Sequence, residues 1–184
     1  MVNARINGID IEVENGISIL DASKKVNIHL PTLCHMHMID GKTRNCKGTC
    51  RICVVEIEGK DGLVPSCVTE IKEGMSIKTN SLRAIKARRT ITELLLSNHP
   101  MDCLRCEKNN ICELQNLAAG LGIHENSYEG ERNKFDLDIS EGFVRDREKC
   151  ILCRRCVTVC NEVQKVNAIT VANRGFRSSI STFC

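Results

Sequence analysis

The stretch HPMDCLRCEKNNIC, residues 99–112, arranges a histidine and three cysteines as H-x3-C-x2-C-x5-C: His99, Cys103, Cys106 and Cys112. Thiolate sulfur and imidazole nitrogen are the ligands that proteins use for iron–sulfur clusters and for zinc. A lone histidine at a helix end is usually a surface residue, but three cysteines within the next thirteen positions favour ligation. The stretch therefore predicts one metal centre held by these four residues.

Two further cysteine sets flank this stretch, so that the 13 cysteines of the 184-residue chain are grouped: Cys34, Cys50, Cys53 and Cys67 before it, and Cys150, Cys153, Cys156 and Cys160 after it. Residues 1–10 are polar and no apolar run reaches the length of a membrane span, so we expect a cytoplasmic protein whose thiols stay reduced. Three metal centres in series would make the chain an electron carrier, with no catalytic site of its own.

The composition excludes nucleic acid as a partner, because a net charge of +3 is weak and one tyrosine with four phenylalanines offers few stacking surfaces. Aromatic residues make up 3% of the chain and tryptophan is absent. Since large apolar side chains are scarce, we expect the metal centres to supply much of the stability of small modules.

The first predicted domain, residues 1–80, resembles a ferredoxin of the β-grasp type in its order of elements. The alternating pattern predicts a hairpin, then a short helix capped by Ser18 with Asp21 three positions on, and then returning strands, at residues 2–6, 9–13, 18–25, 53–57, 63–64 and 76–79. Its cysteines predict a [2Fe-2S] cluster, since Cys50-x2-Cys53 is the tight pair of a plant-type site. Cys46 is the alternative to Cys50, but it lacks the two-residue gap, and we expect it to be a free thiol.

The second domain, residues 81–121, should begin with a helix from Ser81 to about Ser97, followed by the His99 stretch and a short helix that ends at Gly120. An apolar stripe predicts which face of the first helix is buried: Leu82, Ile85, Ile91, Leu94 and Leu95. Its basic residues are interpreted as a solvated face: Arg83, Lys86, Arg88 and Arg89.

The third domain, residues 140–184, carries Cys150-x2-Cys153-x2-Cys156-x3-Cys160, the run of bacterial ferredoxins that hold [4Fe-4S] clusters. In that run the fourth cysteine ligates a second cluster, so the fourth ligand here is either Cys160 or Cys184. A hairpin is expected over residues 168–172 and 176–180. The fold class predicted for the whole chain is α+β, with one [2Fe-2S] and two [4Fe-4S] clusters.

Three stretches carry a resemblance to a known family: GTCRICVVEIEG (48–59), HPMDCLRCEKNNICELQNLA (99–118) and DREKCILCRRCVTVC (146–160). In this order they resemble the amino-terminal part of the large iron–sulfur subunit of respiratory complex I. The same order is found in the electron-input domains of iron-only hydrogenases and in the diaphorase small subunits of NAD-reducing nickel–iron hydrogenases. The resemblance covers nearly the whole chain.

The resemblance implies the same three ligand sets and a place in a multisubunit NAD(P)-linked oxidoreductase. The implied partners are a flavin-bearing NAD(P)H-oxidising subunit and a hydrogenase or formate dehydrogenase subunit, with a soluble ferredoxin as a further candidate. Iron-only hydrogenases continue into a second four-cysteine run, whereas this sequence stops at Cys184, so a truncated electron-input part is one alternative. A zinc-stabilised interaction module without a redox role is the other, because zinc takes the same ligand types.

Overall fold

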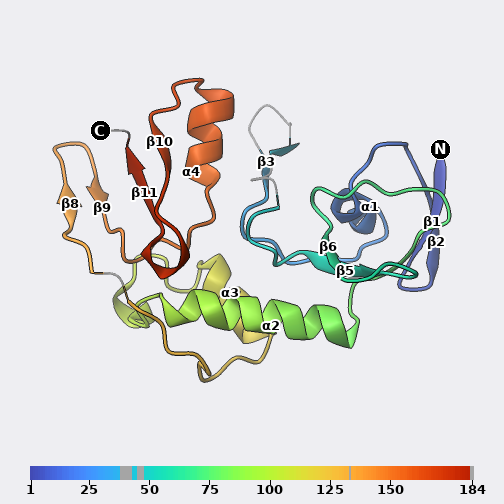
Figure 1. Cartoon of the computed structure of the whole chain (residues 1–184), viewed down its shortest axis with the longest axis horizontal. Helices are drawn as coiled ribbons and strands as arrows, with labels where there is room; N and C mark the ends of the chain where they lie inside the picture. The colour runs from blue at the N-terminus through green and yellow to red at the C-terminus, as the bar shows by residue number, and fades with distance from the viewer. Residues whose placement is uncertain (38–42, 45–47, 133, 183–184) are drawn as a thin grey trace. The chain divides into compact units, whose positions relative to one another are not determined.

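The computed structural model describes residues 1–37, 43–44, 48–132 and 134–182. It divides the chain into two compact units, Met1–Ile91 and Thr92–Cys184, which are described separately below (Figure 1). Cys46 and Cys184, both named in the sequence predictions, lie outside the described residues. No helix in the described ranges is both long enough and apolar enough to cross a membrane.

A five-stranded mixed sheet forms the first unit, in the order β2-β1-β7-β5-β6. Its strands are β1 (Val2–Ile6), β2 (Ile9–Val13), β5 (Val54–Ile57), β6 (Leu63–Pro65) and β7 (Ser76–Lys78). The predicted hairpin is confirmed: β1 and β2 pair from Val2↔Val13 to Ile6↔Ile9. β7 is the central strand: it pairs parallel to β1 and antiparallel to β5, and so joins the two hairpins into one sheet. A short pair, β3 (Met36–His37) with β4 (Thr43–Arg44), lies outside this sheet.

Helix α1 (Ile19–Lys25) packs its apolar face into the core of the sheet. As predicted, Ser18 caps it, and its hydroxyl accepts a hydrogen bond from the Asp21 amide at 3.1 Å. The core is almost entirely aliphatic, with Ile6, Ile19, Leu20, Val55 and Ile77 each no more than 1% exposed. Branched aliphatic side chains therefore replace the missing aromatics, and this unit has a hydrophobic core beside its cysteines.

Helix α2 (Leu82–Ser97) occupies the predicted range, but its predicted burial is wrong. Leu82 is 68% exposed, Ile85 42% and Leu94 44%, whereas Arg88 is only 6% exposed. Buried positions along the helix are mainly small or polar: Ala84, Arg88, Thr92, Glu93, Leu96 and Ser97. The interpretation of the basic residues as a solvated face is therefore wrong for Arg88, whose guanidinium group bonds to backbone in the first unit.

The second unit consists of short elements joined by long loops. They are η1 (Cys103–Arg105), α3 (Glu113–Gly120), the hairpin β8 (Asp138–Ile139) with β9 (Val144–Arg145), α4 (Arg155–Thr158), the π-helical η2 (Val159–Val163), β10 (Ile169–Ala172), η3 (Gly175–Arg177) and β11 (Ser179–Thr182). The predicted tail hairpin is confirmed, with β10 antiparallel to β11. Its second strand starts at Ser179, because residues 175–177 form a 3-10 turn.

Candidate metal centres

Four thiols of the first unit lie together, as the cysteine spacing suggested. Cys34, Cys53 and Cys67 are 0%, 1% and 4% exposed, and Cys50 is half-buried beside them. The Cys34 sulfur is in hydrogen-bond contact with the thiols of Cys50 and Cys67, and the Cys53 sulfur with that of Cys67. A buried set of four mutually adjacent sulfurs is the donor set that a [2Fe-2S] cluster takes.

The thiols of this set differ sharply in acidity. Hydrogen bonds from Cys50 and Cys67 lower the pKa of Cys34 far below its ordinary value. The hydrogen bond from Cys67 lowers the pKa of Cys53 to about 6. The same bonds raise the pKa values of Cys50 and Cys67, which keep their protons. The directions of these shifts favour negative charge at Cys34 and Cys53, and negatively charged sulfur favours a cationic metal.

Local backbone geometry brings these thiols together. Cys53 directly precedes β5 and Cys67 follows β6, and the Ser66 amide bonds the Cys53 carbonyl at 3.1 Å. Between the tight pair, Arg51 takes a left-handed conformation (φ 58°), which turns the chain. Gly48 is also left-handed (φ 68°), and a Cβ there would meet Val68 at 3.2 Å. Glycine suits this position best, because the left-handed conformation disfavours a side chain and a Cβ would push against Val68.

Polar groups around the four sulfurs fit a bound cluster. The buried hydroxyls of Thr49 and Ser66 face Cys34 and Cys53, and neither finds an oxygen or nitrogen partner among the described residues. Arg88 donates from Nε to the Ile52 carbonyl at 3.1 Å and from Nη2 to the Val54 carbonyl at 2.6 Å. Its guanidinium therefore binds the backbone on both sides of Cys53. Burial lowers the pKa of Arg88, and the negative Cys53 sulfur opposes that shift.

The second set lines one small cavity in the second unit. His99, Cys103, Cys106 and Cys112 all border it, together with Pro100, Asp102, Lys108, Asn109, Gln115 and Lys149. Burial lowers the pKa of His99, so its ring is held neutral, as a metal ligand must be. The buried Nδ1 of His99 has no hydrogen-bond partner in the part of the chain that the structure describes. These features fit a [4Fe-4S] cluster with one imidazole ligand.

The loop around this cavity is held by backbone turns and one amide side chain. The Cys106 amide bonds the Cys103 carbonyl at 3.1 Å, and Cys112 is the N-cap of α3. Gln115, one turn into α3, accepts from the Asn110 amide at 3.0 Å and donates to the Asn109 side chain at 3.1 Å. Gln115 therefore fastens the loop between Cys106 and Cys112 to the helix.

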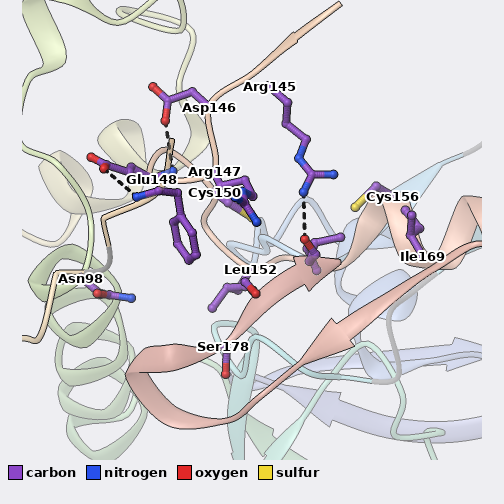
Figure 2. Close-up of a pocket in the computed structure, with 13 residues that line it drawn as sticks. Asn98, Arg145, Asp146, Arg147, Glu148, Cys150, Leu152, Cys156, Ile169 and Ser178 are labelled. Carbon is purple, nitrogen blue, oxygen red and sulfur yellow. Dashed lines mark hydrogen bonds between the residues drawn. The ribbon is translucent and has the colours of Figure 1, made fainter. Parts of the chain in front are cut away.

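The third set borders a pocket of about 230 Å³, which Figure 2 shows with its lining residues. Cys150 and Cys156 line it beside the apolar Leu152, Ile169 and Ile180. The pKa of Cys150 is raised, first because its thiol is removed from water and then by Cys153 and Cys156. The sulfurs of Cys153 and Cys156 are therefore close enough to Cys150 to disfavour its negative charge.

Backbone conformation curls the loop of the third set. Leu152 and Arg154 both adopt left-handed conformations, with φ of 53° and 61°. The Leu152 amide bonds toward the Cys150 sulfur and lowers its pKa against the effect of burial. Peptide N–H groups arranged in this way form concave sites for anions, iron–sulfur clusters included.

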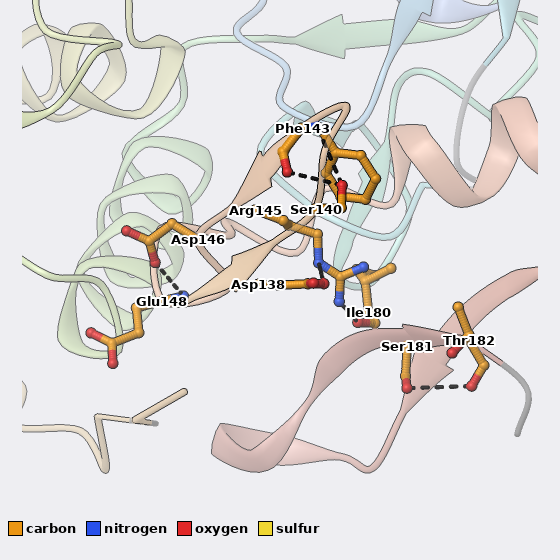
Figure 3. A network of polar contacts seen from close by, with 9 residues as sticks. All are labelled: Asp138, Ser140, Phe143, Arg145, Asp146, Glu148, Ile180, Ser181 and Thr182. Carbon is orange, nitrogen blue, oxygen red and sulfur yellow. Dashed lines mark hydrogen bonds and ion pairs between the residues drawn. The ribbon is translucent and has the colours of Figure 1, made fainter. Parts of the chain in front are cut away.

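The fourth cysteine of the run is in contact with the backbone. The Cys160 sulfur accepts a hydrogen bond from the Ala168 amide at 3.2 Å, and of the four cysteines in the run only Cys150 and Cys156 line the pocket. The pocket wall is fixed by Arg145 of β9, which donates to the Ile180 carbonyl at 3.0 Å and lies 3.8 Å from Asp138 (Figure 3). Arg145 thereby ties β8, β9 and β11 together.

Comparisons with known proteins identify two iron–sulfur regions in the chain. Residues 1–82 match the family model of a 2Fe-2S iron–sulfur cluster binding domain, and residues 88–127 match that of the NADH-ubiquinone oxidoreductase-G iron–sulfur binding region. The chain is 47% identical over 182 residues to the NADP-reducing hydrogenase subunit HndD of Solidesulfovibrio fructosivorans. The chain contains a 2Fe-2S and a 4Fe-4S binding domain and is similar to oxidoreductase subunits. Its identity to the NADPH-Fe(3+) oxidoreductase subunit alpha of Geobacter sulfurreducens (strain DL-1 / KN400) is 39% over 186 residues.

The matches cover this chain almost completely but only part of the relatives. The match to the hydrogenase subunit covers 98% of this chain and 31% of that subunit. The match to the Geobacter subunit covers 99% of this chain and 21% of that subunit. Among solved structures, a chain of the NAD+-reducing [NiFe]-hydrogenase in the H2-reduced state superposes with a TM-score of 0.85 at 27% identity. That match covers 98% of this chain and 74% of the other.

Several contributors to these sites were missed from the sequence. Arg88 was assigned to solvent, Gln115 has no motif, and Arg145 lies in a two-residue strand without a periodic pattern. Within the described ranges, no three histidine, cysteine or carboxylate side chains are grouped as the ligands of a single metal ion. The sets are instead joined by thiol hydrogen bonds or spread around cavities.

Replacing Arg88 tests its role beside Cys53. Arg88→Met should destabilise the first unit, because the buried carbonyls of Ile52, Val54 and Thr79 lose their donor, at about 1–3 kcal/mol for each buried group left unpaired. Urea unfolding at matched iron content would measure the change. Arg83→Met is the control, since Arg83 is an exposed arginine of the same helix that pairs with Glu56 at 3.4 Å. Equal stabilities of the two variants would contradict this role.

Proposed function

We propose that the chain is the iron–sulfur electron-transfer segment of a multisubunit NAD(P)-linked oxidoreductase. A [2Fe-2S] cluster would bind Cys34, Cys50, Cys53 and Cys67 in a β-grasp domain. A [4Fe-4S] cluster would bind His99, Cys103, Cys106 and Cys112. A second [4Fe-4S] cluster would bind Cys150, Cys153 and Cys156, with Cys160 or Cys184 as fourth ligand.

The observation that carries the proposal is the cavity bordered by His99 and three cysteines. The sequence spacing selects these four residues without knowledge of the fold, and the backbone then brings all four to one small space. A half-buried, neutral imidazole beside three thiols has no hydrophobic role to explain it. A cluster ligated by one histidine and three cysteines accounts for every member of the set.

When bound, the clusters would supply one-electron storage, and the chain supplies their positions and surroundings. Buried Cys34, Cys53 and Cys67 exclude water from the first site. Arg88 places a positive charge near it, which compensates part of the negative charge of the sulfurs. Electron transfer through such sites requires no acid, base or nucleophile from the protein.

The relatives support an NAD(P)-linked complex. The names of the two curated relatives describe an NADP-reducing hydrogenase and an NADPH-Fe(3+) oxidoreductase. We infer a flavin-bearing NAD(P)H-oxidising subunit on one side of the chain and a hydrogenase or formate dehydrogenase subunit on the other, in the reducing cytoplasm where thiols stay free. Isolation of the tagged chain from its native cells, followed by flavin analysis and native mass, would identify these partners.

Anaerobic purification with iron, sulfide and zinc analysis tests the central claim. We expect about two irons from the first site and about four from each of the others, with matching sulfide. A colourless, sulfide-free protein with stoichiometric zinc would instead establish a zinc-stabilised interaction module.

A pair of serine substitutions tests the ligands of the first cluster. Cys50→Ser should abolish the [2Fe-2S] signal in paramagnetic resonance, because the Cys50 thiol contacts Cys34 and keeps the two-residue gap to Cys53. Cys46→Ser is the matched control and should leave the signal intact. The opposite pattern would transfer the ligand role from Cys50 to Cys46.

Replacing the imidazole tests the second cluster. His99→Cys should leave the cluster assembled and lower its reduction potential, because an anionic thiolate replaces a neutral ligand. A redox titration followed by paramagnetic resonance would measure the shift, with His124→Cys, at an exposed histidine, as the control. An unchanged midpoint with a fully intact cluster would show that His99 is not a ligand.

A further inference from the structure

Two predicted ligand loops of the second unit are joined by an ion pair. Glu113 directly follows Cys112 in the second set, and Arg155 directly precedes Cys156 in the third. Arg155 Nη1 lies 3.0 Å from Glu113 Oε1, and Arg155 Nη2 lies 2.8 Å from Glu113 Oε2. Two parallel bonds between a guanidinium and a carboxylate fix both distance and orientation.

A second residue of the third loop reaches the second set. Lys149 directly precedes Cys150, and it lines the cavity that His99 and Cys106 border. Its ammonium group is held by Asp146 at 3.2 Å. Two cysteines of the third set, Cys150 and Cys156, therefore follow residues that reach the loop or the cavity of the second set.

The Glu113–Arg155 pair is poorly placed to contribute stability. The Arg155 side chain is 29% exposed and the Glu113 side chain 50%, and ion pairs this accessible to water contribute little to folding. Its geometry matters more than its strength. Helix α4 continues directly into η2, and Cys156 lies in its first turn just after the left-handed Arg154, so the contact of Arg155 with Glu113 holds the end of the helix that carries Cys156.

We propose that the Glu113–Arg155 pair is a positioning element that fixes the separation of the second and third iron–sulfur sites. This inference rests on the proposed function, since it requires clusters at both sets. One electron leaves one site, which is oxidised, and enters the other, which is reduced; no proton or other reactant takes part. Because electron transfer between such sites falls steeply with distance, the pair sets how readily the electron passes.

Magnetic coupling between the two reduced clusters tests the proposal without reference to activity. The full chain, purified anaerobically and reduced with dithionite, should show a spin–spin interaction between them in paramagnetic resonance. Glu113→Gln and Arg155→Met should each weaken or abolish that interaction while both cluster signals and the iron and sulfide contents persist. The exchanged variant, Glu113→Arg with Arg155→Glu, should restore it.

A matched control comes from the first unit. Arg5 and Asp10 form a similar two-point pair, at 2.7 and 3.1 Å, with side chains that are 57% and 74% exposed. Neither residue neighbours a cysteine, so Asp10→Asn should leave the interaction unchanged.

The outcomes separate this inference from the proposed function. An unchanged interaction in Glu113→Gln and Arg155→Met with both clusters present would overturn the positioning role. Loss of cluster signals in the single variants without recovery in the exchanged variant would also overturn it, because the residues would then serve assembly alone. Absence of iron and sulfide from the unmodified chain would overturn the proposed function itself.

Discussion

Negative charge on buried sulfur is the constraint on which the first unit depends. Neighbouring thiols lower the pKa values of the almost fully buried Cys34 and Cys53, which favours the thiolate at both, and an uncompensated buried charge is very costly. The fold answers this cost with thiol donors, backbone amides and one cation, Arg88. Arg88 belongs to α2 and bonds the carbonyls on both sides of Cys53, and this contact explains why a polar position of that helix is buried. The aliphatic core around α1 provides a rigid support for this arrangement.

The second unit is held together in a different way, and its described cysteines are half-buried or exposed. Its elements are short, and single side chains connect its loops. Gln115 fastens one loop to α3, and Arg145 connects the β8–β9 hairpin to the tail hairpin. Such connections are individually weak, so this unit depends on whatever binds its cysteines more than the first unit does. The hydrophobic core cluster lies in the first unit, which explains this difference between the two units.

The sequence supported prediction where one physical rule dominated. The β1–β2 hairpin follows from alternating apolar residues and the Asn7-Gly8 turn. The beginnings of α1 and α2 follow from the capping residues Ser18 and Ser81. Cysteine spacing indicated the thiols of the first set, which the structure brings into contact although Cys34 and Cys67 lie far along the chain from the pair Cys50 and Cys53. The sequence failed on α2, since the long-range demand of buried carbonyls overrode its apolar periodicity and drew Arg88 inward.

Contacts between distant segments could not be predicted from the sequence, because they too depend on long-range packing. Glu113 and Arg155 are 42 positions apart, and nothing local marks either as a partner. The β8–β9 strands have two residues each, too few to display a period. Side-chain pairing across loops depends on the final path of the chain, which a single sequence does not encode in any short pattern.

The left-handed residues Leu152 and Arg154 have a consequence for how this protein can vary. The loop of the third set polarises its cysteines with main-chain amides, which every residue except proline possesses. The side chains at positions 152 and 154 are therefore constrained mainly through backbone conformation, whereas Arg155 is also constrained by its pair with Glu113. Glycine or asparagine at positions 152 and 154 would be accepted readily, whereas valine or isoleucine would be selected against. The site is thus inherited as a backbone shape, a set of cysteines and one ion pair.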